Sequence, residues 1–126
     1  METSKGMSKE TGDAGEALAL AHLLQQGLCL VRRNYRVARG PRSRGGEIDL
    51  IMRDADGTLV FVEVRSRAQH AQGGAAASVG SAKRRRLVFA ARHFLRGLAT
   101  LPPCRFDVVA IDGGKIEWLR AAFDAE

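Results

Sequence analysis

The chain has 126 residues, of which 45% are hydrophobic and 27% are charged, proportions that are ordinary for a soluble globular protein. A chain of this length forms one domain that buries roughly two-thirds of the surface its unfolded form exposes. No run approaches the ~18 apolar residues that a membrane span needs, and the N-terminal residues lack the apolar core of a signal peptide. We therefore expect a cytoplasmic protein that is not embedded in a membrane.

The net charge of +6 and the pI near 10.1 favour nucleic acid as a partner, with an acidic membrane surface as the weaker alternative. The 20 basic residues comprise 16 arginines and 4 lysines, a bias that a GC-rich genome also produces.

Cys29 and Cys104 lie far apart and lack the spacing of a zinc site. We expect both thiols to be buried and reduced.

Apolar residues recur at helical spacing over residues 11–26 and stop at Gly27, which predicts a first helix. The predicted apolar stripe of this helix consists of Ala14, Ala17, Leu18, Ala21 and Leu24. A strand is expected over residues 28–37 and a basic loop over 38–45.

Two apolar, β-branched runs at 46–53 and 58–65 predict a central hairpin. The Gly/Ala/Ser-rich segment 66–80 is expected to be a mobile loop, and a second helix is expected over 81–96, ending at Gly97. Strands at 104–111 and 115–119 complete the chain. The inner stripe of the second helix should contain Leu87, Ala90, Ala91, Phe94, Leu95 and Leu98.

The element order is therefore α-β-β-β-α-β-β, which predicts an α/β fold with a mixed central sheet of about five strands flanked by helices. Residues 11–120 form the single domain in this interpretation. Residues 1–10 are expected to be a disordered tail, and residues 121–126 a short C-terminal tail.

Three acidic residues interrupt the hairpin runs: Glu47, Asp49 and Glu63. An unpaired carboxylate is costly to bury in a strand. If the three carboxylates converge, a functional role should account for that cost. Asp49 lies opposite Glu63 if paired residue numbers sum to 112, which leaves residues 55–57 as a three-residue loop. Such loops favour a left-handed final residue, and Gly57 supplies it. A two-residue turn would instead put the two acids on opposite faces of the sheet.

With this register, Asp49 and Glu63 repel each other unless a cation joins them. Oxygen ligands at this separation suit Mg²⁺ or Mn²⁺, which can polarise a phosphoryl oxygen and lower the pKa of an attacking water. The alternative is an exposed sheet face on which Glu63 pairs with Arg65 or Arg67 and Asp49 pairs with Arg44, contacts that are worth little. The same register puts Glu47, Asp49, Ile51, Phe61, Glu63 and Arg65 on one face, and Ile48, Leu50, Val60, Val62 and Val64 on the other.

At these residues the chain resembles the YraN-like family of small bacterial proteins. The resemblance covers about residues 11–118 in order and with similar spacing. It is carried by Gly12-Asp13-Ala14-Gly15-Glu16-Ala17-Leu18-Ala19, Arg33-Asn34-Tyr35-Arg36, Gly46-Glu47-Ile48-Asp49-Leu50-Ile51, Val60-Phe61-Val62-Glu63-Val64-Arg65, the stretch from Gly73-Gly74-Ala75-Ala76 to Lys83, and Arg105-Phe106-Asp107-Val108-Val109.

The resemblance implies a restriction-endonuclease-like fold, related to archaeal Holliday-junction resolvases, with a PD-(D/E)xK-type site. It makes Asp49, Glu63 and Arg65 the catalytic residues, and Glu16, Asp49 and Glu63 the ligands of Mg²⁺ or Mn²⁺. Ile48 stands where the motif has proline, which is a mild change. Arg65 stands where lysine is usual; arginine cannot accept a proton near neutral pH, but it can hold a phosphate with two hydrogen bonds.

Several basic residues are candidates for holding nucleic acid. Lys83 and Arg84 open the second helix, where backbone N–H groups attract phosphate, although a solvated basic face is the plainer alternative. Arg33, Arg36 and Arg44 belong to an arginine-rich segment, and Arg67 follows the acidic pair.

Two hypotheses follow, together with a weaker third. The first is a metal-dependent endonuclease that cleaves structured or branched DNA, and the second is a non-catalytic nucleic-acid-binding protein with the same fold. The third is an adaptor whose basic surface meets an acidic protein. Resolvases act as dimers, so a homodimer is also an expectation, although the sequence identifies no self-complementary surface.

Overall fold

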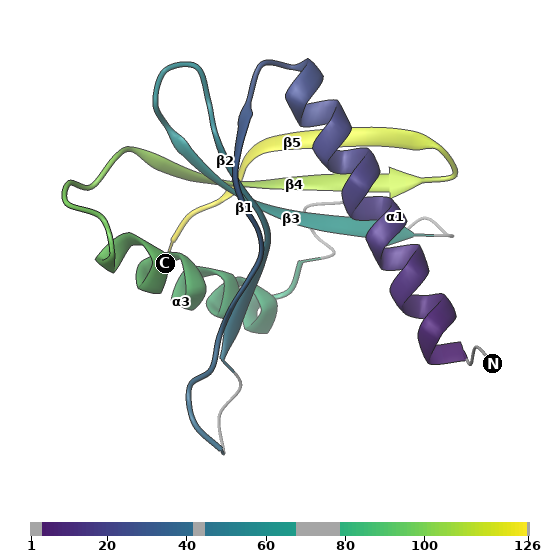
Figure 1. Ribbon diagram of the computed structural model, residues 1–126, viewed down its shortest axis with the longest axis horizontal. Coiled ribbons are helices and arrows are strands. Elements are labelled where there is room, and N and C mark those ends of the chain that lie inside the picture. The colour runs from purple at the N-terminus through teal and green to yellow at the C-terminus, as the bar shows by residue number, and fades with distance from the viewer. Residues whose placement is uncertain (1–3, 42–44, 68–78, 126) are drawn as a thin grey trace.

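The computed structural model describes the backbone of residues 4–41, 45–67 and 79–125, and the side chains of residues 14–41, 45–66 and 79–125. Within these residues the order of elements is α-β-β-β-α-β-β, as predicted (Figure 1). The elements are α1 (Ser4–Gln25), β1 (Cys29–Val37), β2 (Gly46–Arg53), β3 (Leu59–Arg67), α3 (Ser81–Arg96), β4 (Cys104–Asp112) and β5 (Lys115–Phe123).

The strands form one sheet in the order β1-β2-β3-β4-β5. Only β3 and β4 are parallel neighbours among the described strands, and the other three pairs are antiparallel. A parallel pair needs a long crossover connection, and α3 lies in the one between β3 and β4. The predicted mixed sheet of five strands is therefore confirmed.

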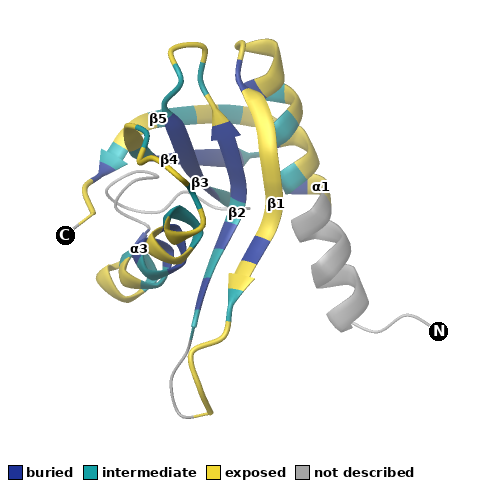
Figure 2. Cartoon of the chain, turned by 60° about the vertical axis from the view of Figure 1, so that its left-hand side comes forward, coloured by how far each residue is buried: buried dark blue, intermediate teal, exposed yellow. Residues whose placement is uncertain are grey.

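The two described helices cover opposite faces of the sheet (Figure 2). The α3 face is the larger cluster, in which Leu87, Ala90 and Ala91 pack against Ile51 and Phe61. Phe94, Leu95 and Leu98 are partly buried beside them, so the predicted inner stripe of this helix is confirmed.

The predicted stripe of the first helix is wrong. Leu18 and Leu24 are 49% and 48% exposed, whereas Ala19 and Leu23 are fully buried against β2, β3 and β4. Alanine and leucine occur on every side of this helix, so apolar spacing could not select the inner face. Gly15 lies on that face, and a Cβ there would come within 3.0 Å of Ser66 Oγ, which shows how closely α1 approaches the sheet.

The predicted hairpin register is confirmed. The paired residues of β2 and β3 run from Leu50↔Val62 to Arg53↔Leu59, and all of these pairs sum to 112. The Asp54 N–H donates to the Thr58 carbonyl at 2.9 Å, and Gly57 has a φ of 92°. The loop therefore has three residues and a left-handed last position.

Ile48 departs from the predicted alternation, because it joins the α3-side cluster rather than the α1 side. The pairing of β2 with β3 ends at Leu50↔Val62, so the strict alternation of faces does not extend to Ile48. The neighbouring strand is also irregular there, since Asn34 of β1 has a φ of 53°. Tyr35, the partner of Ile48 on β1, lies in the same cluster.

Helix α1 and strand β5 are longer than the sequence pattern predicts. Helix α1 begins at Ser4, within the predicted N-terminal tail, because a segment without apolar periodicity can still continue a helix. Strand β5 runs to Phe123, past a left-handed residue at Ala121 with φ 49°. The ring of Phe123 stacks on that of Phe106 at 5.1 Å, so burial of this ring holds the strand end on the core.

The two cysteines are free and exposed, so the expected burial of their side chains is wrong. Each is the first residue of a strand, Cys29 of β1 and Cys104 of β4. Within the described part of the chain, no helix combines the length and hydropathy that crossing a membrane requires.

Candidate carboxylate site

Asp49 and Glu63 come together where β2 and β3 stop pairing. Oδ2 of Asp49 accepts a hydrogen bond from the backbone N–H of Val64 at 2.8 Å. Glu63 is only 3% exposed. Glu63 is therefore not on an exposed face, although the ion pair with Arg65 that the alternative interpretation expects is present. A buried carboxylate must be compensated by its neighbours.

Two cations lie beside this pair, one on α3 and one on the sheet. Nζ of Lys83 lies 3.6 Å from Oε2 of Glu63 and 3.4 Å from Oε2 of Glu47. Arg65, two residues after Glu63, lies 3.6 Å from the same Glu63 oxygen. Lys83 therefore bridges two acidic side chains of different strands.

Burial, and then repulsion from the Asp49 carboxylate, raise the pKa of Glu63 to about 7. Lys83 and Arg65 act in the opposite direction. Burial also raises the pKa of Asp49, although the Val64 N–H and Lys83 oppose the rise. Oε1 of Glu63 is buried and accepts no hydrogen bond from the described residues. Burial therefore disfavours the charged form of both carboxyl groups, and the cations beside them offset only part of this effect.

Glu16 lies on α1 and contacts residues of β1. Its Oε1 lies 3.8 Å from a guanidinium nitrogen of Arg33. The Asn34 amide, oriented with its nitrogen toward the carboxylate, donates to both Glu16 oxygens at 3.2 and 3.0 Å. Asn34 lies between the pairs Arg33↔Leu50 and Tyr35↔Ile48, so it runs alongside Asp49 on the neighbouring strand.

The structure therefore brings Asp49 and Glu63 together, whereas Glu16 of α1 contacts Arg33 and Asn34 of β1. Among the described side chains, no three acidic, histidine or cysteine groups are close enough to hold a metal ion. Two carboxylates are nevertheless enough for Mg²⁺, which commonly takes one or two and fills its other positions with water and substrate phosphate. The unpartnered Glu63 Oε1 fits such an ion.

The predicted nucleic-acid contacts separate into two kinds. Arg36 is 75% exposed and lies 3.7 Å from Glu47, so it faces solvent beside the site. Arg84 instead donates to the Val79 carbonyl at 2.9 Å, and its guanidinium lies 5.0 Å from the centre of the Phe123 ring. Arg84 therefore holds α3 to the rest of the fold. Arg44 and the side chain of Arg67 lie outside the described residues.

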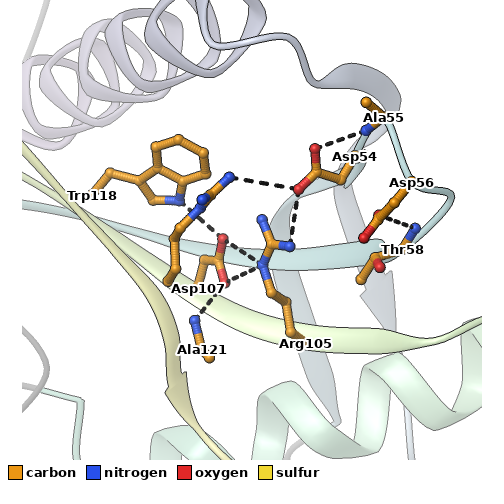
Figure 3. Close-up of polar contacts among 9 residues, drawn as sticks. Asp54, Ala55, Asp56, Thr58, Arg105, Asp107, Trp118 and Ala121 are labelled. Atoms are coloured by element: carbon orange, nitrogen blue, oxygen red, sulfur yellow. Dashed lines mark hydrogen bonds and ion pairs between the residues drawn. The ribbon is translucent and has the colours of Figure 1, made fainter.

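Asp107, which matches a family position, is structural (Figure 3). Its fully buried carboxylate accepts from Arg105 Nε at 3.1 and 3.2 Å, from Trp118 Nε1 at 2.9 Å and from the Ala121 N–H at 2.9 Å. The same Arg105 donates to Asp54 in the hairpin loop at 3.0 Å. This network joins β4 to β5 and to the β2–β3 loop.

The contact of Lys83 with Glu63 and Glu47 is the feature of the candidate site that the sequence pattern did not predict. Its signal lies in Gly46, where a Cβ would come within 2.3 Å of the Arg86 carbonyl and 3.0 Å of Ala90. Only glycine allows α3 to approach the start of β2 this closely, and that approach brings Lys83 to Glu47.

The fold and this site define an α/β domain with a five-stranded mixed sheet and two converging acidic side chains on adjacent central strands. Residues 15–111 match the model of the family described as "Uncharacterised protein family UPF0102". The chain belongs to this family, and the YraN-like resemblance is confirmed.

Relatives match along nearly the whole chain. The UPF0102 protein of Methylibium petroleiphilum is 67% identical over 118 residues, covering 94% of this chain and 97% of the relative. The one of Albidiferax ferrireducens is 58% identical over 125 residues, covering 99% and 95%. The one of Paracidovorax citrulli is 60% identical over 121 residues, covering 96% and 87%.

Proposed function

We propose that this protein is a metal-dependent phosphodiesterase that acts on nucleic acid, with a PD-(D/E)xK-like site. The observation that supports this most is the buried Glu63, which has one unpartnered oxygen and lies beside Asp49. A protein gains nothing structurally from burying two repelling carboxylates, and perturbed acids of this kind concentrate at functional sites. The net charge of +6 matches a polyanionic substrate.

Asp49 and Glu63 are the residues that would hold Mg²⁺ or Mn²⁺. The bound cation would supply Lewis-acid polarisation of the phosphoryl oxygen and a more acidic water. Asp49 is held in place by the Val64 N–H, so its carboxylate is oriented before substrate arrives. Asn34, which lies alongside Asp49 on the adjacent strand, donates to the carboxylate of Glu16 on α1.

Lys83 is the residue that would take the place of the lysine that the motif has at Arg65. Its ammonium lies 3.6 Å from Glu63, where a positive charge would stabilise negative charge developing on the phosphate. Arg65 lies at the same distance from Glu63 and would bind a phosphate oxygen with its planar donors. The two cationic roles are thereby divided between α3 and β3.

A non-catalytic nucleic-acid-binding protein is the second candidate. The ion pairs of Glu63 with Lys83 and Arg65 favour it, because they offset part of the buried charge without a metal ion. Nucleic-acid binding by such a protein would be steeply salt-dependent and indifferent to Mg²⁺.

Calorimetric titration of Mn²⁺ into the wild type and Asp49→Asn separates these candidates. We expect the wild type to bind the ion and the variant to lose binding, with Glu117→Gln on the exposed part of β5 as the matched control. A parallel assay would follow cleavage of linear, flapped and four-way-junction DNA, because the resemblance to Holliday-junction resolvases implies branched DNA as a substrate. If the wild type neither binds the ion nor cleaves DNA, the enzyme hypothesis is wrong and the non-catalytic binding protein is the remaining candidate.

A further inference from the structure

Two open clefts lie side by side next to the carboxylate pair, between the start of β2 and α3. The first has a volume of about 430 Å³ and is lined by Arg36, Glu47 and Arg86 among others. The second has a volume of about 240 Å³ and is lined by Arg39, Arg85, Arg86 and Phe89 among others. Gly45 and Arg86 line both clefts, so the two form one hollow, which we name the arginine cleft.

The arginine cleft is strongly positive. Four arginines line it (Arg36, Arg39, Arg85 and Arg86), and Glu47 is the one acidic side chain among its lining residues. Glu47 is already paired with Arg36 at 3.7 Å and with Lys83 at 3.4 Å. None of the described ion pairs neutralises Arg39, Arg85 or Arg86. Their positive charges can therefore bind an anionic ligand.

The far end of the cleft is ordered by a stacking contact. The guanidinium of Arg39 lies 5.0 Å from the centre of the Phe89 ring, a cation–π arrangement that orients arginine and leaves its edge free to donate. Phe89 itself is half-buried. A flat cation fixed on a ring is suited to a phosphate group, and the exposed part of the ring is suited to a base.

The near end of the cleft leads into the carboxylate site. Glu47 lines the cleft and also contacts Lys83, which in turn contacts Glu63. A chain of phosphates that leaves Glu63 along the α3 side therefore meets Arg36 and Arg86 first, and then Arg39 and Arg85. Arg39 belongs to the predicted basic loop, and Arg85 and Arg86 follow Lys83 and Arg84 on α3; the structure brings these separate basic segments to one hollow.

We propose that the arginine cleft holds the phosphate backbone of the nucleic acid on one side of the reacting phosphodiester, without reading its bases. This inference rests on the proposed function and adds the path of the substrate. Arginine contacts to phosphate fix the position of a strand but carry no sequence information. The protein should therefore bind nucleic acids of unrelated sequence with equal affinity.

The test is the salt dependence of binding to a fluorescent DNA duplex in EDTA, where cleavage cannot interfere. Arg39→Gln, Arg85→Gln and Arg86→Gln would be compared with the wild type between about 50 and 300 mM NaCl. Each lost phosphate contact should reduce the slope of log affinity against log salt by about 0.9 and weaken binding about tenfold at low salt. Arg39 and Arg85 are exposed, so their variants remain folded even if the half-buried Arg86 does not tolerate the change.

Arg53→Gln is the matched control, because Arg53 is exposed at the opposite end of β2 and should keep the wild-type slope. Wild-type slopes for Arg39→Gln and Arg85→Gln would overturn the cleft assignment while leaving the proposed function intact. A wild-type protein that binds no DNA would instead overturn both. Slopes that change equally in Arg53→Gln would show diffuse attraction by net charge, which also overturns the assignment.

Discussion

The backbone N–H of Val64 in β3 donates to the side chain of Asp49 in β2, at 2.8 Å. The regular pairing of these strands ends at Leu50↔Val62, so a carboxylate here takes the place that a carbonyl would have in a continuous ladder. Asp49 thus has a structural partner in addition to its place beside Glu63. The two roles can be separated by the choice of substitution.

Asp49→Ala should lower the free energy of unfolding more than Asp49→Asn. Both variants remove the repulsion between Asp49 and Glu63, but only asparagine keeps an oxygen that can accept the Val64 N–H. Leaving a half-buried N–H unpaired costs about 1–3 kcal/mol, which is the expected difference between the two variants. Urea unfolding would measure it, and equal stabilities would show that the N–H finds another partner.

Glu63→Gln should stabilise the metal-free protein above neutral pH. The ordinary pKa of a glutamate is 4.5 and that of Glu63 in the fold is about 7, so the folded state binds this proton more tightly than the unfolded chain. Wild-type stability therefore falls as the pH rises from about 4.5 to about 7, and it stays lower above that range. Glutamine carries no charge and escapes this loss.

At about pH 8 the glutamine variant should be more stable by on the order of 3 kcal/mol, because one pKa unit corresponds to about 1.4 kcal/mol. The advantage should shrink toward zero below about pH 4.5, where Glu63 is protonated in both states. Urea unfolding across this range measures the difference. A stability gap that does not change with pH would refute the raised pKa of Glu63.

Lys83→Met should separate catalysis from metal binding. The ammonium is 3.6 Å from Glu63, so its removal leaves the carboxylates free to bind a cation and takes away a charge that would stabilise the transition state. We expect Mn²⁺ affinity to be equal or higher and cleavage to fall by about 100-fold or more. Lys115→Met, at the exposed start of β5, is the control. Undiminished cleavage by Lys83→Met would exclude the catalytic role.

The hairpin that carries the acids could be predicted from sequence because local rules determine it. The sequence left a two-residue and a three-residue loop open, and the three-residue loop with Gly57 last is the one that brings Asp49 and Glu63 together. The buried face of α3 could also be predicted from the sequence, because its apolar residues occupy a single face of the helix.

Other features depend on contacts between distant segments, which spacing does not encode. The inner face of α1 was missed because the small residues Gly15 and Ala19 bury against the sheet while Leu18 and Leu24 remain exposed. The approach of Lys83 to Glu63 depends on how near α3 lies to β2. Ile48 changed faces because the β2–β3 pairing ends before it.

Asp107→Ala should be the most destabilising of these substitutions. It leaves the Trp118 Nε1–H, the Ala121 N–H and the Nε–H of Arg105 without their shared acceptor. Removing one partner of a buried charged network costs about 3–5 kcal/mol. Thermal unfolding followed by Trp118 fluorescence would measure the loss, with Asp124→Ala at the exposed C-terminal end as control. A small loss would show that Asp54 alone satisfies Arg105.

Gly46→Ala tests whether the close approach of α3 positions Lys83. A Cβ at residue 46 would come within 2.3 Å of the Arg86 carbonyl, so α3 must move outward. Such overpacking costs about 1–3 kcal/mol. Gly97→Ala is the control, because a Cβ there makes an ordinary 3.5 Å contact and its φ of −83° suits alanine.

The movement of α3 has a second consequence that stability alone does not report. Lys83 lowers the pKa of Glu63 by its charge, and this effect weakens as the ammonium withdraws. In Gly46→Ala the pKa of Glu63, measured by NMR titration of its side-chain carbon, should therefore rise above its wild-type value of about 7. A destabilised variant with an unchanged Glu63 pKa would mean that Lys83 keeps its distance from Glu63 when α3 moves. In that case Gly46 is needed only for the packing of α3 on β2.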